Sequence, residues 1–270
     1  MTKKIAIIVL GCASPPYDVM IDTIRTTWAG VKAPGIDIYY LYGNPDDDYS
    51  RSVLSRYIVG NVSPVKEDEI KAIGDVLIAG CGDNFRQQED CILRKRLIAF
   101  GYLASVGVYD LIYTVCATSY VDQQRLKQHA DHLTTKRMIS GVVSLNPCGI
   151  PFVSGASMLM STDVAWQLSA DRHEIIEQNR FGFRDDVTIG HWIVTRMSKL
   201  SLETFADDVR RQNPMTPAHI FVPYPRTTVD YVMAPAEKHR PVADAFHYHF
   251  HSRKPGDMIG FHRRYFSNDL

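Results

Sequence analysis

The segment from Tyr109 to Asp122 contains the residues whose types and position point most directly to chemistry. It begins as a short run of apolar, β-branched and aromatic residues, which is typical of a buried strand. It then changes to small and polar residues at Cys116 to Ser119. Ligands of open α/β sheets bind at the carboxyl ends of the strands, so these residues are predicted to lie at a ligand site. No carboxylate occurs among them, and carboxylates are the ligands that Mg²⁺ or Mn²⁺ prefers.

Histidines and cationic residues gather near the end of the chain. In an extended segment His247, His249 and His251 share one face, because side chains alternate along a strand. They could then bind a metal ion or a phosphate group, or they could simply form a partly exposed strand face. Four cations follow, at Arg253, Lys254, Arg263 and Arg264. Such a tail either folds over an anionic ligand or stays solvated.

The elements that must position these groups alternate between strands and helices, which predicts an α/β fold with a mostly parallel sheet flanked by helices. Strands are expected at Ile5 to Leu10, Ile36 to Tyr42, Asp75 to Ala79, from Tyr109, and at Ile139 to Leu145, with a further apolar segment at Phe152 to Met160. Helices are expected at Val19 to Ala29, Arg86 to Ser105, from about Asp122, from Asp163, and at Asp185 to Met197. The acidic run Asp46 to Asp48 is interpreted as a loop or a helix start rather than a metal site.

The character of the chain changes near residue 200. Seven prolines follow, at positions 214, 217, 223, 225, 235, 241 and 255. Proline fixes φ and removes a backbone donor, so this region is predicted to be irregular. We expect residues 1–200 to form the core and residues 201–270 to form an extension that wraps the site, within a single domain.

Composition limits the classes of protein to which the chain can belong. Thirty basic and thirty acidic residues cancel, so no overall field attracts nucleic acid or an anionic membrane. The five cysteines are odd in number and lack metal-type spacing, which favours a reducing compartment. No apolar run reaches the roughly 20 residues that span a bilayer. A signal peptide is the alternative to a first strand at Ile5 to Leu10, but its apolar run would be short, and the strand is the preferred interpretation.

Four segments resemble, in the same order, motifs of the fringe/β-1,3-galactosyltransferase-like family of glycosyltransferases. Ile24-Arg25-Thr26-Thr27-Trp28 resembles the family's Ile-Arg-x-Thr-Trp, and Asp83-Asn84-Phe85 with Lys95 resembles its Asp-x-Tyr…Lys. Pro151 to Gly155 with Leu159 to Asp163 resembles Pro-Tyr-x-Ser-Gly…Leu-Ser-x-Asp, and Asp185 to Gly190 resembles Glu-Asp-Val-x-x-Gly. Together the matches cover the chain from Ile5 to about Trp192, and they imply a GT-A-like fold.

The chain departs from this family at Cys116, Ala117 and Thr118. These residues align with the family's Asp-Asp-Asp when Tyr120-Val121 is placed over its Phe-Val. In the family those acids bind the divalent metal that holds a nucleoside diphosphate. We therefore expect no particular cofactor, and the alternative is a bound Mn²⁺ or Mg²⁺. We expect the hydroxyl groups of Thr118 or Ser119 to donate to the phosphates instead.

The resemblance implies an inverting glycosyltransferase that moves a sugar from a nucleotide-diphosphate donor, such as a UDP-sugar, to a glycan or another hydroxyl acceptor. Asp186 would be the general base, with Asp185 beside it, and the alternative is that both only stabilise a helix N-terminus. Ser154 and Gly155 would contact the acceptor, because glycine lets a ligand approach the backbone, or they would form a bulge needed for packing.

The donor site is expected to include Arg25, Asp83, Lys95, Cys116, Thr118, Ser119, His249, His251, Arg253 and Arg263. Arg25 contacts either the nucleotide or a structural carboxylate. Lys95 belongs either to the donor site or to a solvated helix face. Trp28, at helical spacing from Ile24, is expected in the core rather than at the site.

Two further functions stay open. One is a non-catalytic family member that binds a sugar nucleotide or a glycan, and the other is sugar transfer to a modified nucleic-acid base. The neutral net charge argues against a nucleic-acid partner, because phosphate contacts usually supply most of the affinity. Animal members of the family are membrane-anchored in the secretory pathway. An anchor is not evident here, so a bacterial or viral enzyme of the cytosol (the host cytosol for a virus) is expected.

Overall fold

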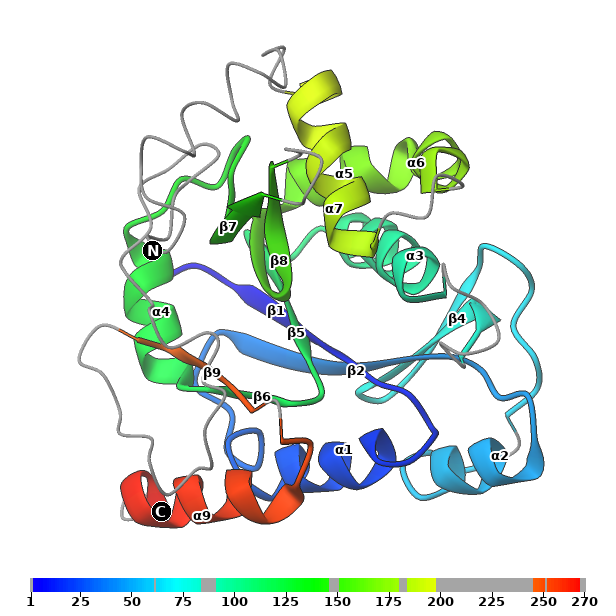
Figure 1. The fold of residues 1–270 in the computed structure, drawn as a ribbon, viewed down its shortest axis with the longest axis vertical. Helices are drawn as coiled ribbons and strands as arrows, with labels where there is room; N and C mark the ends of the chain where they lie inside the picture. Colours follow the sequence, from blue (N-terminus) through cyan, green and yellow to red (C-terminus); the bar gives the residue numbers. More distant parts are fainter. Residues whose placement is uncertain are drawn as a thin grey trace.

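The computed structural model describes residues 2–60, 62–83, 91–145, 151–179, 184–197, 245–250 and 252–267. Within these residues one seven-stranded sheet forms the centre of an α/β fold, with helices on both faces (Figure 1). Its strands are β1 Ile5–Leu10, β2 Ile36–Asn44, β3 Ile70–Ile73, β4 Val76–Gly82, β5 Leu111–Cys116, β7 Ile139–Leu145 and β8 Pro151–Ser161. The order across the sheet is β3-β4-β2-β1-β5-β8-β7.

The sheet is parallel in the middle and antiparallel at its margins. Strands β4, β2, β1 and β5 run in one direction, whereas β3 and β8 each pair antiparallel with their inner neighbours. The prediction of a parallel sheet is therefore confirmed for the central strands, and the sheet as a whole is mixed. The reversal of β8 has a consequence for the site. Its first residues, including Ser154 and Gly155, lie at the edge where the parallel strands end.

The helices pack on the sheet through two separate apolar cores. Helices α1 Tyr17–Thr26, α2 Asp48–Ser55, α4 Gln123–Asp131 and α9 Pro255–Tyr265 cover one face. Helices α3 Cys91–Val106, α5 Thr162–Ala170, α6 Arg172–Gln178 and α7 Asp185–Trp192 cover the other, and a π-helical segment, Ile193–Met197, continues α7 (Figure 1). Strand β1 is buried on both sides, because Ile5, Ile7 and Val9 enter the first core and alternate residues enter the second.

Several local predictions are confirmed by the caps and the core. Asp47 accepts a hydrogen bond from the backbone N–H of Ser50 at 2.7 Å, so the acidic run starts helix α2. Asp122 caps α4 in the same way through Arg125. Trp28 is a core residue, and its indole N–H donates to the carbonyl of Ser119 at 2.9 Å.

The end of the chain returns to the body of the fold. Strand β9, His247–His249, pairs antiparallel with β6, Ser119–Val121, and α9 then packs against α1. Aromatic rings fill the space between them, with Tyr120 5.2 Å from Phe261 and 5.0 Å from Phe266 between ring centroids. Six of the seven C-terminal prolines, at positions 214 to 241, lie outside the described residues.

Candidate functional site

The ends of several elements meet at the carboxyl edge of the parallel strands. Strands β1, β2, β4 and β5 end there, β8 begins there, and helix α7 begins beside β8. Two ion pairs with buried cations hold this edge together, and these cations come from consecutive positions of helix α3. Neighbouring residues of a helix point about 100° apart, so Lys95 and Arg96 reach different halves of the edge.

The first half is built around Asp83 and Lys95. Their side chains are 4% and 2% exposed, and the Lys95 ammonium lies 3.0 Å from Oδ1 of Asp83. Asp83 also accepts hydrogen bonds from the backbone N–H groups of Ala13 and Gly43, both at 2.7 Å. Lys95 in turn donates to the carbonyl of Gly11 at 2.9 Å. The pair therefore ties together the loops that follow β1 and β4 and the end of β2.

Lys95 stays charged in this setting. Burial acts to lower its pKa, but the charge and hydrogen bond of Asp83 together with the thiols of Cys91 and Cys12 more than offset burial, so the pKa lies above its usual value. The alternative that Lys95 belongs to a solvated helix face is wrong, because its side chain is enclosed. Asp83 and Lys95, two of the residues predicted for the donor site, thus lie at the carboxyl edge, and their polar atoms already bind groups of the protein.

The second half joins α3, β8 and α7. Arg96 is 1% exposed, and its Nη1 lies 2.6 Å from Oδ2 of Asp185 while its Nη2 donates to the carbonyl of Gly155. The N–H of Gly155 donates to Oδ2 of Asp186 at 3.0 Å. A Cβ at position 155 would lie only 3.0 Å from Nη1 of Arg96 and 3.3 Å from Cβ of Asp186. The lack of a side chain at Gly155 therefore permits close packing of Arg96 and Asp186, and its contact with an acceptor stays a prediction.

The pKa of Asp186 is raised above its ordinary value. Burial raises its pKa, the charge of Asp185 raises it further, and hydrogen bonds from Gly155 and Val187 together with the charge of Arg96 oppose the rise without cancelling it. A raised pKa brings a carboxylate closer to the operating pH, where base catalysis is most efficient. Both carboxylates also lie in the first turn of α7, where negative charge stabilises the helix N-terminus, although the N-cap residue itself is Arg184.

The end of β5 lies next to this pair. Sγ of Cys116 is 3.9 Å from the carbonyl of Gly155, and burial raises the pKa of the thiol to about 11. The thiol is therefore neutral near pH 7, which suits neither a nucleophile nor a ligand of Mg²⁺ or Mn²⁺. Ser119 is fully buried, with its hydroxyl 3.5 Å from Nδ1 of His249, and Thr118 is also buried. Ser119 thus faces strand β9 rather than the open edge.

The histidines of the tail point into the protein. His247 and His249 share a face as predicted, with rings stacked 6.4 Å apart, and both are buried, so the partly exposed strand face is wrong for these two. Nδ1 of His247 lies 2.6 Å from the hydroxyl of Tyr113, which lies 2.9 Å from that of Ser157. Burial holds the pKa of His247 well below its usual value, so its ring is neutral. His251 lies outside the described residues.

Two of the predicted arginines make none of the contacts described above for either half of the edge. Arg25 binds both carboxylate oxygens of Asp75, at 2.8 and 3.0 Å, and lies over the ring of Tyr40 at 3.8 Å. Asp75 directly precedes β4, whose first residue, Val76, pairs with Tyr40 in the middle of β2. The structural-carboxylate alternative is the one observed for Arg25. Arg263 is exposed on α9.

Arg253, in contrast, lies at the carboxyl edge. It is exposed, and its guanidinium carbon is 5.6 Å from the ring centroid of Tyr17, the first residue of α1. It is near enough to Cys116 to favour the thiolate, although burial dominates there. An exposed cation beside the neutral end of β5 can bind an anionic group.

The residues at the end of β5 do not fit a hard divalent cation. A neutral thiol, a methyl group and a buried threonine stand at Cys116, Ala117 and Thr118. Within the described part of the chain, no three side chains of His, Cys, Asp or Glu come together to hold a metal ion. We therefore derive no chemical step through a metal at this strand end.

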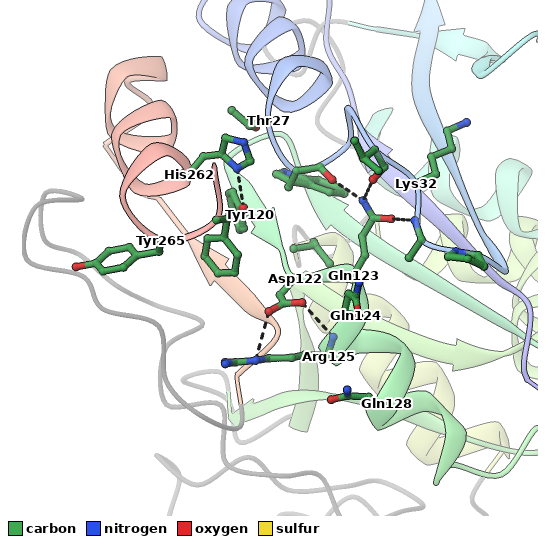
Figure 2. A pocket seen from close by; sticks show the side chains of 16 residues that line it. Thr27, Lys32, Tyr120, Asp122, Gln123, Gln124, Arg125, Gln128, His262 and Tyr265 are labelled. Carbon is green, nitrogen blue, oxygen red and sulfur yellow. Dashed lines mark hydrogen bonds and ion pairs between the residues drawn. The ribbon is translucent and has the colours of Figure 1, made fainter. Parts of the chain in front are cut away.

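A separate pocket of about 760 Å³ lies at the other end of the strands, beside the loop that leads into β2 (Figure 2). One wall comes from α9 and carries His262, Tyr265 and Phe266, and the facing wall comes from the start of α4. The second wall includes three amide side chains, Gln123, Gln124 and Gln128. None of the residues predicted for the donor or acceptor lines this pocket.

Arg96 is the functional candidate that motif matching missed. A signal was present, since Arg96 stands three residues after Leu93 and four before Phe100, on the apolar stripe of its helix. A charged residue on such a stripe is expected to be buried with a partner.

Comparisons with known proteins add no family to this picture. No protein-family model matches the chain, and no curated protein sequence matches it. A search of the described helices finds none with the length and apolar character required to cross a membrane.

Proposed function

We propose that this protein is a GT-A-like glycosyltransferase that moves a sugar from a nucleoside-diphosphate donor, a UDP-sugar, to a hydroxyl acceptor with inversion at the anomeric carbon. The observation that carries the proposal is Asp186. It is a largely buried carboxylate at the carboxyl edge of the sheet, with a raised pKa and a fixed orientation. The four motif resemblances supply the reaction class, and the central parallel strands agree with the fold that they imply.

The reaction proceeds in one displacement. Asp186 takes the proton of the acceptor hydroxyl while the acceptor oxygen forms a bond to the anomeric carbon. The bond from that carbon to the diphosphate oxygen breaks, and its electron pair leaves with the diphosphate. Negative charge on the leaving group grows in the transition state, so a cation near it lowers the barrier. Arg253 is an exposed cation at this edge that can provide the charge.

The test is nucleotide release from a panel of UDP- and GDP-sugars, each with and without simple hydroxyl acceptors. Asp186→Asn should reduce release by at least about 100-fold, because general-base catalysis contributes on the order of 10²- to 10⁴-fold. The matched control is Asp48→Asn, which makes the same change on a fully exposed side chain of α2 and should leave turnover unchanged. Equal activity of wild type and Asp186→Asn would reject Asp186 as the base.

A second candidate function is glycan binding without transfer, and the pocket in Figure 2 favours it. Aromatic faces and amide groups on opposite walls suit the C–H faces and hydroxyl groups of a sugar ring. The measurement is a calorimetric titration of oligosaccharides into wild type and into a Gln124→Ala/Gln128→Ala variant. Binding that the variant loses, with no turnover of any donor, would replace the enzyme proposal with this one.

A further inference from the structure

The two carboxylates at the start of α7 are adjacent in the chain but have different partners. Asp185 forms a 2.6 Å ion pair with the enclosed guanidinium of Arg96. Asp186 forms no ion pair within the described residues, and its oxygens instead accept from the N–H groups of Gly155 and Val187, at 3.0 and 2.9 Å. Two neighbouring carboxylates that differ in this way divide their roles, because the paired one is engaged by a cation while the raised pKa of the other makes it better able to take up a proton.

Arg96 also fixes the strand that orients Asp186. One nitrogen of its planar fork binds Asp185 on α7, and another donates to the carbonyl of Gly155 on β8. The same glycine donates its N–H to Asp186. The peptide of Gly155 therefore stands directly between Arg96 and Asp186, and the absence of a side chain allows the close approach.

We propose that Arg96 is the positioning residue of this site, which holds Asp185 as a fixed anchor and leaves Asp186 as the carboxylate that accepts a proton. This inference deepens the proposed function, and it rests on that function only for the source of the proton, an acceptor hydroxyl. Arg96 itself is enclosed and acts through its two neighbours rather than through the substrate.

The groups around Asp186 make the inference measurable. After burial, the charges that act on the pKa of Asp186 are Asp185, which raises it, and Arg96, which lowers it. Cys116 faces the pair from β5 as a neutral thiol, and Arg253 lies near Cys116 from the segment before α9. A change at Arg96 or at Asp185 should therefore move the pKa of Asp186, and the two changes should move it in opposite directions.

The test measures the pKa of Asp186 directly, without any need for activity. Protein with ¹³C-labelled aspartate carboxyl groups is titrated by NMR, and the signal of Asp186 is assigned by its loss in Asp186→Asn. Arg96→Met should raise the pKa by about one unit or more, because the attraction is removed and the repulsion from Asp185 remains. Asp185→Asn should lower it, and Arg96→Lys, which keeps the charge, should leave it near the wild-type value. Arg51→Met removes an arginine from an exposed ion pair of α2 and should leave it unchanged.

Activity then supplies a second readout. The acid limb of the pH dependence of kcat/KM should move to higher pH in Arg96→Met and to lower pH in Asp185→Asn, in step with the NMR titration. An unchanged pKa in both variants overturns the inference even if sugar transfer is observed. If the pKa of Asp186 shifts as expected but no donor is turned over, the proposed function is overturned and the assignment of Arg96 stands. If Arg96→Met does not fold, Asp185→Asn still tests the inference, because it should lower the pKa of Asp186. This variant is expected to fold, since the side chain of Asp185 is partly exposed and its loss leaves the contact between Arg96 and the carbonyl of Gly155 in place.

Discussion

Replacing Lys95 with methionine separates a structural role of this residue from a role in donor binding. Methionine keeps most of the volume of the lysine stem but removes the charge. Asp83 would retain its two bonds to backbone N–H groups and lose its only ion pair within the described residues, at a site where it is 4% exposed. Breaking one side of a buried pair typically costs about 3–5 kcal/mol. The two remaining bonds to Asp83 place the expected loss near the lower end, at about 3 kcal/mol.

The assay is equilibrium urea denaturation of wild type, Lys95→Met, Asp83→Asn and the double variant. In the double variant neither charge is left buried alone. We therefore expect its loss of stability to be smaller than the sum of the two single losses, by about 2 kcal/mol. Arg51→Met is the matched control, because the Arg51–Asp48 pair is shorter, at 2.7 Å against 3.0 Å, but is exposed, and its loss should leave the unfolding midpoint unchanged. A Lys95→Met protein with wild-type stability and no affinity for UDP-sugars would refute the structural role and return Lys95 to the donor site.

Three other outcomes follow from the described contacts. Turnover should survive EDTA, measured as nucleotide release before and after chelation, and complete loss rescued by Mn²⁺ would contradict this. His247 is neutral when folded because burial lowers its pKa, so stability should fall as the pH drops below about 6.5, where only the unfolded chain binds the proton. This histidine contributes a slope of up to about 1.4 kcal/mol per pH unit to the free energy of unfolding as a function of pH, and thermal unfolding of His247→Gln should lack that contribution. Gly155→Ala should lose about 1–3 kcal/mol and most turnover, since its Cβ would press on Arg96, whereas Gly260→Ala, with open space around the added atom, should be neutral or stabilising.

The central sheet could be predicted because its strands are short apolar runs bounded by turn residues. The direction of β8 could not be predicted in this way. An apolar run has the same composition whichever way it crosses a sheet, and strand direction depends on the connection and on its partners. The alternation of strands and helices favoured a parallel neighbour for β5, whereas β8 pairs with it in the antiparallel sense, with Val115 opposite Ser157.

The partners of a charged residue could not be predicted where burial decides its role. Lys95 and Arg96 belong to the basic run Arg94-Lys95-Arg96, which is typical of a solvated helix face. Helix α3 is enclosed on more than one side, so two of the three cations point inward and need carboxylate partners. Those partners, Asp83 and Asp185, stand 12 and 89 residues away, and only the folded chain brings them together.

The ion pairs of Lys95 and Arg96 link the elements that meet at the carboxyl edge. A metal ion held by strand-end carboxylates links the loops that carry them. Here Lys95 and Asp83 link the ends of β1, β2 and β4, while Arg96 links β8 to the start of α7. Both cations leave one helix at consecutive positions, so a displacement of α3 disturbs both halves of the edge at once. Buried pairs add little to net stability compared with apolar packing, but they strongly penalise wrong arrangements of their partners. At this edge these pairs therefore fix how Asp83, Gly155 and the two carboxylates Asp185 and Asp186 lie relative to one another.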